Sequence, residues 1–499
     1  MRLVELAETS GLVAGTRSRI EKRALIAALL ASAPRSEIAL ATAYLSGTLP
    51  QRRTGLGWRG LVDLPAPATE ATLTLTEVDR RLDELAALAG PGSAGERTRL
   101  VRDLFDALTS TEQDYLRSLL TGAVRQGALD SVVLDAIATA ANVPLAEVRR
   151  AAMFSATSGP VAYAALTGGT DALRRFTLEI GRPVRPMLAS SAPGIADALA
   201  GFTGPVVVDT KLDGIRIQVH KEAYRVRVYT RSLEEISERL PAVVAAVRVL
   251  PADRLVLDGE ALLVDETGRA RPFQETSAGT ASTAGTSAVP FFFDLLAHDD
   301  ETLIDDPGVV RWTRLDELVP ASMRTERLVT GDADAAAGFF EQALAAGHEG
   351  VIVKDPSAPY AAGRRGAAWV KVKPRHTLDL VVLAVEWGSG RRRGLLSNIH
   401  LGARSGPGQF VMLGKTFKGM TDEMLAWQTE RFLDLETHRD GHVVHLRPEQ
   451  VVEVAFDGVQ RSSRYPGGVA LRFARVLRYR EDKLANEADT IDVVRALRH

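Results

Sequence analysis

A lysine stands at the end of a predicted strand in the stretch VVVDTKLDGIRIQVH, residues 206–220. Apolar β-branched residues in rough alternation on both sides predict two strands joined by a tight Leu-Asp-Gly turn. A desolvated, deprotonated lysine can attack phosphorus or a carbonyl carbon and hold a covalent intermediate. Because Lys-x-Asp-Gly also arises by chance, commonly as a hairpin with a solvated lysine, Lys211 alone indicates little.

Further charged and aromatic residues follow on predicted strands downstream of this lysine. They are Arg216, Arg231, Glu260, Phe293, Glu349, Lys354, Lys371 and Lys373. Singly, each is typical of a solvated surface. Together they supply two carboxylates for a hard divalent cation, several cations for phosphates, and an aromatic ring that can stack on a base. Such a set is suited to attack on an α-phosphate, where catalysis is mostly positioning and charge stabilisation.

The elements that must position these residues change along the chain. Residues 1 to about 180 have apolar residues at helical spacing, and a helical core is expected to contain Leu104, Leu108, Leu116, Leu119 and Leu120. From about 185 to Pro374, short β-rich runs predict a mixed α/β or antiparallel domain. Residues 376 to about 480 continue with strands and have the size of a small β-barrel.

Composition sets the outer limits. A chain of 499 residues predicts two to four domains, and 45% hydrophobic with 25% charged residues is typical of soluble globular protein. The absence of cysteine excludes disulfides, thiolate chemistry and cysteine-ligated zinc. The acidic N-terminus and the lack of an 18-residue apolar run predict a cytoplasmic protein with no membrane segment. A net charge of −2 argues against a uniformly basic surface but permits basic patches.

The motifs KLDGIR, TRSLEE, LDGEALLVD, FFFDLL, EGVIVKD and WVKVK occur in this order and resemble the motif series of covalent nucleotidyltransferases, specifically ATP-dependent DNA ligases. RFARVLRYREDK, residues 472–483, is similar to the last motif of that series, and LTSTEQDYLRSLLTGAVRQGAL resembles part of a ligase DNA-binding domain. Length and composition are most like the actinobacterial B-type ligases. The resemblance implies an all-α DNA-binding domain (1–183), an α+β adenylation domain (184–375) and an OB-fold β-barrel (376–499).

The resemblance also implies residue roles. Lys211 would become adenylated, Glu260 and Glu349 would hold the metal, and Phe293 would stack on adenine. The other implied contacts to ATP or AMP are Asp209, Arg216, Arg231, Glu260, Lys354, Arg365, Lys371 and Lys373, with Arg364 as the alternative to Arg365. Arg478, Arg480 and Lys483 would orient the pyrophosphate. Thr109, Arg117 and Arg125 would contact DNA.

ATP and Mg²⁺, with Mn²⁺ as a substitute, are the implied cofactors, and nicked double-stranded DNA is the implied partner of a monomeric enzyme. Protein partners and the pathway served stay open. The chain departs from the family after RPFQ. There the family usually has a helix that carries a further basic residue, whereas this chain has a Ser/Thr/Ala/Gly tract, 277–289.

The expected reaction requires a deprotonated lysine, whereas an ordinary lysine has a pKa of about 10.4. Burial, Arg216, Lys371 and a bound magnesium ion are expected to lower the pKa of Lys211. An RNA ligase or a GTP-dependent capping enzyme would share much of this core, and a non-catalytic nick-binding scaffold is a third class. An NAD-dependent ligase would need a four-cysteine zinc module, which this chain cannot form.

Overall fold

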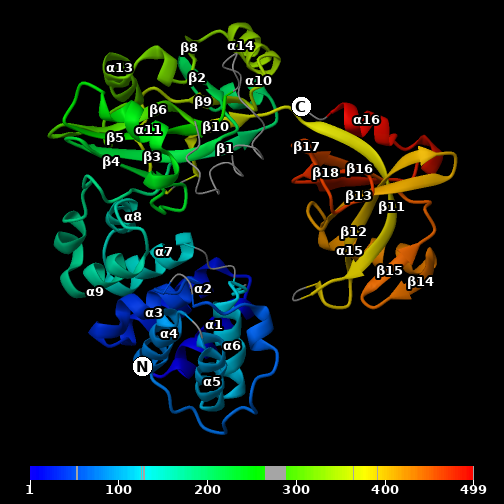
Figure 1. The fold of residues 1–499 in the computed structure, drawn as a ribbon, viewed down its shortest axis with the longest axis horizontal. Coiled ribbons are helices and arrows are strands. Elements are labelled where there is room, and N and C mark those ends of the chain that lie inside the picture. The colour runs from blue at the N-terminus through cyan, green and yellow to red at the C-terminus, as the bar shows by residue number, and fades with distance from the viewer. Residues whose placement is uncertain are drawn as a thin grey trace.

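The computed structural model describes residues 1–51, 54–90, 92–124, 126, 130–264, 288–363, 365–389 and 392–497. Figure 1 shows three parts in chain order: a helical N-terminal region, a central part built around sheets, and a β-rich C-terminal part. The predicted fold class is confirmed by this arrangement. The domain boundaries at 183/184 and 375/376 stay predictions.

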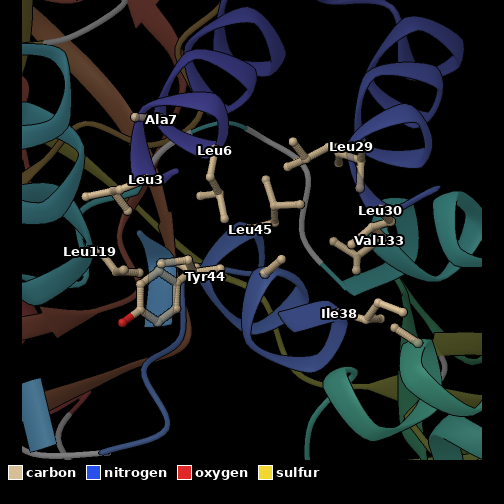
Figure 2. Close-up of a cluster of buried hydrophobic side chains, with 14 of the residues drawn as sticks. Leu3, Leu6, Ala7, Leu29, Leu30, Ile38, Tyr44, Leu45, Leu119 and Val133 are labelled. Carbon is tan, nitrogen blue, oxygen red and sulfur yellow. The ribbon is translucent and has the colours of Figure 1, made fainter. Parts of the chain in front are cut away.

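The N-terminal region consists of packed helices around one apolar core. Its α-helices are α1 (Leu3–Gly15), α2 (Arg19–Ser32), α3 (Ile38–Leu45), α4 (Leu75–Ala87), α5 (Ser93–Asp106), α6 (Ser110–Leu120), α7 (Asp130–Ala141), α8 (Leu145–Met153) and α9 (Gly159–Arg174). Figure 2 shows Leu3 and Leu6 of α1 and Tyr44 of α3 in this core. Of the five leucines expected there, Leu120 is only partly buried and the other four are buried.

The central part contains two five-stranded sheets. Its elements are β1 (Leu188–Ala192), α10 (Ile195–Leu199), β2 (Val206–Lys211), β3 (Ile215–Glu222), β4 (Arg225–Thr230), α11 (Pro241–Arg248), β5 (Arg254–Leu262), β6 (Val289–His298), β7 (Glu301–Thr302), α13 (Gly308–Leu318), β8 (Arg327–Thr330), α14 (Ala333–Ala345), β9 (Gly350–Lys354) and β10 (Arg365–Val372). One sheet has the order β1-β10-β9-β2-β8 and the other β4-β3-β5-β6-β7. Helices α10 and α14 pack on the first sheet, and α11 and α13 on the second.

The C-terminal part is a curled sheet with short additions. Its elements are β11 (His376–Trp387), β12 (Leu396–Gly406), β13 (Gln409–Thr416), α15 (Asp422–Asp434), β14 (Glu436–Asp440), β15 (Val443–Leu446), β16 (Val451–Phe456), β17 (Gly458–Arg461), β18 (Val469–Arg472), β19 (Arg475–Arg480) and α16 (Ile491–Ala496). The long strand β11 pairs with β12 on one edge and with β15 and β16 on the other, and β16 also pairs with β19. This shared pairing makes the sheet curl on itself.

The helical region is joined to the central part by a shared apolar cluster. Met153 and Phe154, where α8 ends, pack with Val256 of β5 and Leu296 of β6. This core therefore ties the end of the helical region to the sheet that carries Phe293. In the described part of the chain, no helix is long and apolar enough to cross a membrane.

Candidate active site

A cleft of about 1090 Å³ lies among the two central sheets and the C-terminal part. Its central-part lining contains Asp209, Lys211, Arg216, Arg231, Glu260, Phe293, Glu349, Lys354, Lys371 and Lys373. These residues come from many elements and span more than 160 positions in the sequence. The structure therefore brings together most of the residues that the sequence implied for nucleotide chemistry.

The Leu-Asp-Gly turn fixes the end of β2 beside β5. Gly214 is required there because an added Cβ would lie 2.6 Å from the carbonyl oxygen of Ala261. The Gly214 N–H donates to Glu260 Oε2 at 2.9 Å, so the turn and the carboxylate hold one another. Gly350 has a φ of +138°, and a Cβ there would collide with the Val372 carbonyl oxygen. Only glycine therefore lets β9 begin next to β10 and place Glu349 in the cleft.

Lys211 is held by a carboxylate from a distant strand. Its Nζ donates to Glu349 and to the Leu212 carbonyl oxygen, the latter at 3.3 Å. Glu349 also accepts from Lys373, so one carboxylate lies between two ammonium groups. Its backbone N–H donates to the Lys211 carbonyl oxygen at 3.0 Å, which aligns the two residues.

The charges around Lys211 favour its protonated form. Burial lowers the pKa of Lys211, but the carboxylates of Glu349 and Glu260 outweigh burial and raise that pKa above its ordinary value. The expectation of a lowered pKa is therefore wrong for the protein on its own, because the sequence did not reveal that Glu349 contacts the amine. Burial favours the neutral form of Glu349 too, yet Lys211 and Lys373 lower its pKa overall.

Glu260 and Glu349 fit the requirements of a hard divalent cation only as part of a ligand set. Burial, together with the like charge of Glu349, raises the pKa of Glu260 despite nearby Lys211 and Gly214. The described residues contain no group of three or more His, Cys, Asp or Glu side chains arranged to hold a metal ion. Magnesium commonly takes one or two carboxylates and completes its shell with water and substrate phosphates, which is compatible with this pair.

Aromatic rings surround a buried lysine at another end of the cleft. The Phe293 and Trp369 rings meet edge to face at 5.9 Å, and Lys354 Nζ lies 4.6 Å from the Trp369 ring centroid and 5.1 Å from that of Phe293. Lys354 pairs with Asp209, and both are almost fully buried. Burial lowers the pKa of Lys354 although Asp209 opposes that shift. Lys354 is therefore engaged by protein groups, and Phe293 keeps a face in the cleft lining.

Arg216 is held in a buried polar network. Its guanidinium makes two hydrogen bonds to Asp258, at 3.1 and 2.7 Å, and one to the Met187 carbonyl oxygen at 2.6 Å. Tyr360 donates to the same Asp258 at 2.6 Å. Asp258 raises the pKa of Arg216 against the effect of burial. Sequence reasoning did not single out Asp258 or Tyr360, although Asp258 lies inside the LDGE motif.

Other predicted nucleotide contacts differ in what the structure says of them. Arg231 follows β4, is exposed, and its side chain makes no hydrogen bond or ion pair with the described residues. Lys371 lines the cleft from β10. Arg365 begins β10, but its side chain and all of Arg364 lie outside the described structure, so the choice between them stays open. Most of the 277–289 tract, up to residue 287, is likewise outside the described residues.

The C-terminal part contributes to the cleft through residues that sequence reasoning did not assign. Lys418, Arg472, Phe473 and Arg475 line it. Arg472 donates to Asp213 at 2.9 Å, and Lys373 lies 3.5 Å from Asp457, so two ion pairs cross between the parts. The RFARVLRYREDK motif could have indicated Arg472, since its first residue is this arginine.

The predicted pyrophosphate-orienting residues do not line the cleft. Arg478 donates to Glu453 at 2.6 Å. Arg480 and Lys483 both pair with Asp379, at 3.0 and 2.6 Å. In this arrangement of the parts, all three are therefore engaged within the C-terminal part.

Two of the three predicted DNA contacts make local interactions in the helical region. Thr109 is the N-cap of α6 and forms a capping box with Glu112. Arg117 pairs with Asp114 at 2.7 Å, one turn earlier on the same helix. Arg125 lies outside the described residues. Thr109 therefore has a structural task, because capping satisfies backbone N–H groups at the start of the helix.

The three-part architecture has a counterpart among solved structures. The structure titled Pmar-Lig_PreS3 superposes with a TM-score of 0.66, covering 95% of this chain and 99% of its own, at 18% sequence identity. At this identity the likeness shows the fold alone.

Sequence comparisons reach further. Family models described as "ATP dependent DNA ligase domain", "ATP dependent DNA ligase C terminal region" and "DNA ligase N terminus" match residues 186–373, 392–483 and 61–138. Probable DNA ligases from Beutenbergia cavernae and Kineococcus radiotolerans are each 60% identical, covering all of this chain and 99% and 100% of their own lengths. The chain belongs to the family of ATP-dependent DNA ligases.

Proposed function

We propose that this protein seals nicks in duplex DNA with ATP, joining a 3′-hydroxyl to a 5′-phosphate through a covalent Lys211–AMP intermediate, in DNA replication, repair or recombination. The observation that supports this most directly is the amine of Lys211 beside Glu349 and Lys373, in a cleft that also holds Phe293. A nucleophile, phosphate-neutralising cations and a base-stacking ring in one cleft are what nucleotide transfer requires.

The reaction is three displacements at phosphorus. Deprotonated Lys211 Nζ attacks the α-phosphorus of ATP, a P–N bond forms, and the bond to pyrophosphate breaks. An oxygen of the DNA 5′-phosphate then attacks the AMP phosphorus, and the P–N bond breaks as Lys211 recovers a proton. Finally the 3′-hydroxyl attacks the activated 5′-phosphate and AMP leaves. Lys371 and Lys373 would offset the charge that develops at phosphorus.

Activation of Lys211 requires that the charge of its carboxylate neighbours be neutralised. Glu260 and Glu349 would hold Mg²⁺, or Mn²⁺ in its place, since carboxylate oxygens suit both. A bound divalent cation would supply positive charge beside the amine, which lowers a lysine pKa. With its carboxylate on the metal, Glu349 would no longer keep Lys211 protonated.

DNA binding falls to the helical region. The helical region would grip phosphates around the nick, which adds affinity without sequence preference. Arg478, Arg480 and Lys483 do not line the cleft and are paired within the C-terminal part, so they would act on the pyrophosphate only after that part turns about the segment between β10 and β11. The enzyme would work as a monomer on DNA in the cytoplasm.

The test is transfer of label from α-labelled ATP to the full chain. Wild type is expected to become labelled with ATP but not with GTP or NAD, and then to seal a DNA nick. Lys211→Arg and Lys211→Ala should bind ATP and take up no label, because a guanidinium cannot be deprotonated and alanine has no amine. Label in either variant would exclude Lys211 as the nucleophile. Labelling with GTP would favour a capping enzyme. Preferential sealing of RNA would favour an RNA ligase. If wild type took up no label, a non-catalytic scaffold would be favoured.

A further inference from the structure

The Thr325 hydroxyl lacks a hydrogen-bond partner in the described part of the chain. The residue lines the cleft and is only 6% exposed. Buried polar atoms in native proteins are almost always hydrogen-bonded, and an exception calls for an explanation such as a ligand. Among the described residues that line the cleft, this hydroxyl is one of two buried side-chain atoms without a hydrogen-bond partner.

The backbone holds Thr325 between the two central sheets. Its N–H donates to the Phe292 carbonyl oxygen at 3.1 Å, next to Phe293. In the antiparallel pairing of β2 with β8, Asp209 lies opposite Arg327, and the bond from Thr210 N to the Glu326 carbonyl oxygen continues that register. Thr325 lies two residues before β8, so one further step along this register brings it level with Lys211, and Thr325, Lys211 and Asp209 all line the cleft.

Asp209 supplies the second unexplained atom. Its Oδ2 accepts from Lys354, whereas Oδ1 has no hydrogen-bond partner among the described residues and lies 3.9 Å from Arg327 Nε. Asp209 is 2% exposed and also lines the cleft. A carboxylate oxygen can only accept a hydrogen bond, while a threonine hydroxyl can donate and accept. The cleft therefore offers one buried acceptor and one buried donor that have no hydrogen-bond partner among the described residues.

These two atoms match one purine edge and oppose another. Adenine presents an amino group that donates beside a ring nitrogen, N1, that accepts, whereas guanine presents a carbonyl oxygen beside an N–H. Phe293, on the strand that Thr325 touches, supplies a ring on which a purine can stack. The guanine carbonyl oxygen would face the Asp209 carboxylate, which is repulsive, and a site built to pair a specific donor discriminates strongly.

We propose that Thr325 selects adenine: its hydroxyl donates to N1 of the base while Asp209 Oδ1 accepts from the 6-amino group. This inference rests on the proposed function, because it assigns the contact to the ATP that adenylates Lys211. Thr325 is then a base-contacting residue, and its loss should weaken nucleotide binding more than it slows the transfer step.

The test compares ATP with 1-deaza-ATP, in which a C–H group replaces N1. Full-length wild type is expected to prefer ATP by about tenfold in kcat/KM of self-adenylation, equivalent to about 1.4 kcal/mol. Thr325→Val, which keeps the side-chain shape, should raise KM for ATP and so lower kcat/KM for ATP to the level of 1-deaza-ATP. It should leave kcat/KM for 1-deaza-ATP unchanged. Thr325→Ser should restore the preference. Thr313→Val is the matched control, since that exposed hydroxyl bonds only to its own helix at Val309.

Two results would overturn the proposal. Equal losses of ATP and 1-deaza-ATP in Thr325→Val would show that the hydroxyl supports the fold, and an unchanged preference for ATP would show that it does not touch N1. Calorimetric binding of the two nucleotides to Lys211→Ala chains, with and without Thr325→Val, makes the same comparison without a covalent step. A wild type that never becomes adenylated would thus contradict the proposed function, while the binding ratio still decides the role of Thr325.

Discussion

The buried pair of Lys354 and Asp209 gives the sharpest test of the electrostatics of this cleft. Lys354 is 1% exposed, and burial lowers its pKa despite the attraction of Asp209. The pair is therefore costly to bury, and removing the lysine takes away the closest cation to the Asp209 carboxylate. Lys354→Met keeps the length of the side chain but leaves the Asp209 carboxylate with only the longer ion pair to Arg327 Nε, at 3.9 Å, and breaking a buried pair costs about 3–5 kcal/mol.

Calorimetric unfolding measures this loss. The central part is of the size class of about 150–250 residues, for which a loss of about 3–5 kcal/mol corresponds to a fall in Tm of about 6–20 °C. Adding Asp209→Asn removes the orphaned charge, so the double variant should regain most of the lost stability. Lys221→Met is the matched control: Lys221 is also buried but donates to the Leu250 carbonyl oxygen at 2.6 Å, so Asp209→Asn should be additive with it.

The double variant decides between two explanations. If Lys354→Met and the double variant are equally unstable, the loss comes from the packing of the lysine stem against Trp369 and Phe293, and the orphaned-charge reasoning is refuted. If Lys354→Met costs less than about 1 kcal/mol, water reaches Asp209 and the pair is not buried in solution.

Three further outcomes are expected. Removing residues after 470 would delete β19, which pairs with β16, so the point variants Arg480→Ala and Lys483→Ala test the pyrophosphate-orienting role better. Each variant should slow self-adenylation more than it slows sealing of a nick that already carries AMP. Equal losses in the two steps would favour a structural role. Deleting residues 1–150 spares Met153 and Phe154 and should leave protein–AMP formation nearly intact. Nick binding in gel-shift assays should weaken by orders of magnitude and become strongly salt-sensitive. Unchanged nick sealing at moderate salt would contradict DNA binding by this region. Burial opposes ionisation of Glu386, but hydrogen bonds from Lys415, His400 and Asn398 lower its pKa to about 2. Urea unfolding of Glu386→Gln should therefore show a free energy of unfolding lower by about 1–2 kcal/mol at neutral pH, allowing for solvent screening, and this difference should disappear as pH falls from about 4.5 to 2. A difference that does not change with pH would exclude this titration.

Local patterns in the sequence determined the architecture and most of the cleft. Alternating apolar residues predict the strands around Lys211, and the Leu-Asp-Gly turn after it requires glycine at 214 for a steric reason that acts within a few residues. Helical spacing of apolar residues predicts the N-terminal core, because this periodicity indicates which face of each helix is buried. The order of the motifs identified the residues that line the cleft, because each motif lies at one strand or turn.

Only the tertiary structure decided which charges meet. Lys211 and Glu349 are 138 residues apart, and Arg472 and Asp213 are 259 apart, so their contacts depend on strand register and on how the C-terminal part sits against the centre. The direction of the Lys211 pKa shift follows from such a contact, and the pairing of Arg480 with Asp379 is another. Tertiary structure also left the Thr325 hydroxyl without a hydrogen-bond partner among the described residues. Electrostatic interactions act through space over a few ångströms, whereas a sequence specifies only residue types and their order, so these partners became known only once the sheets were assembled.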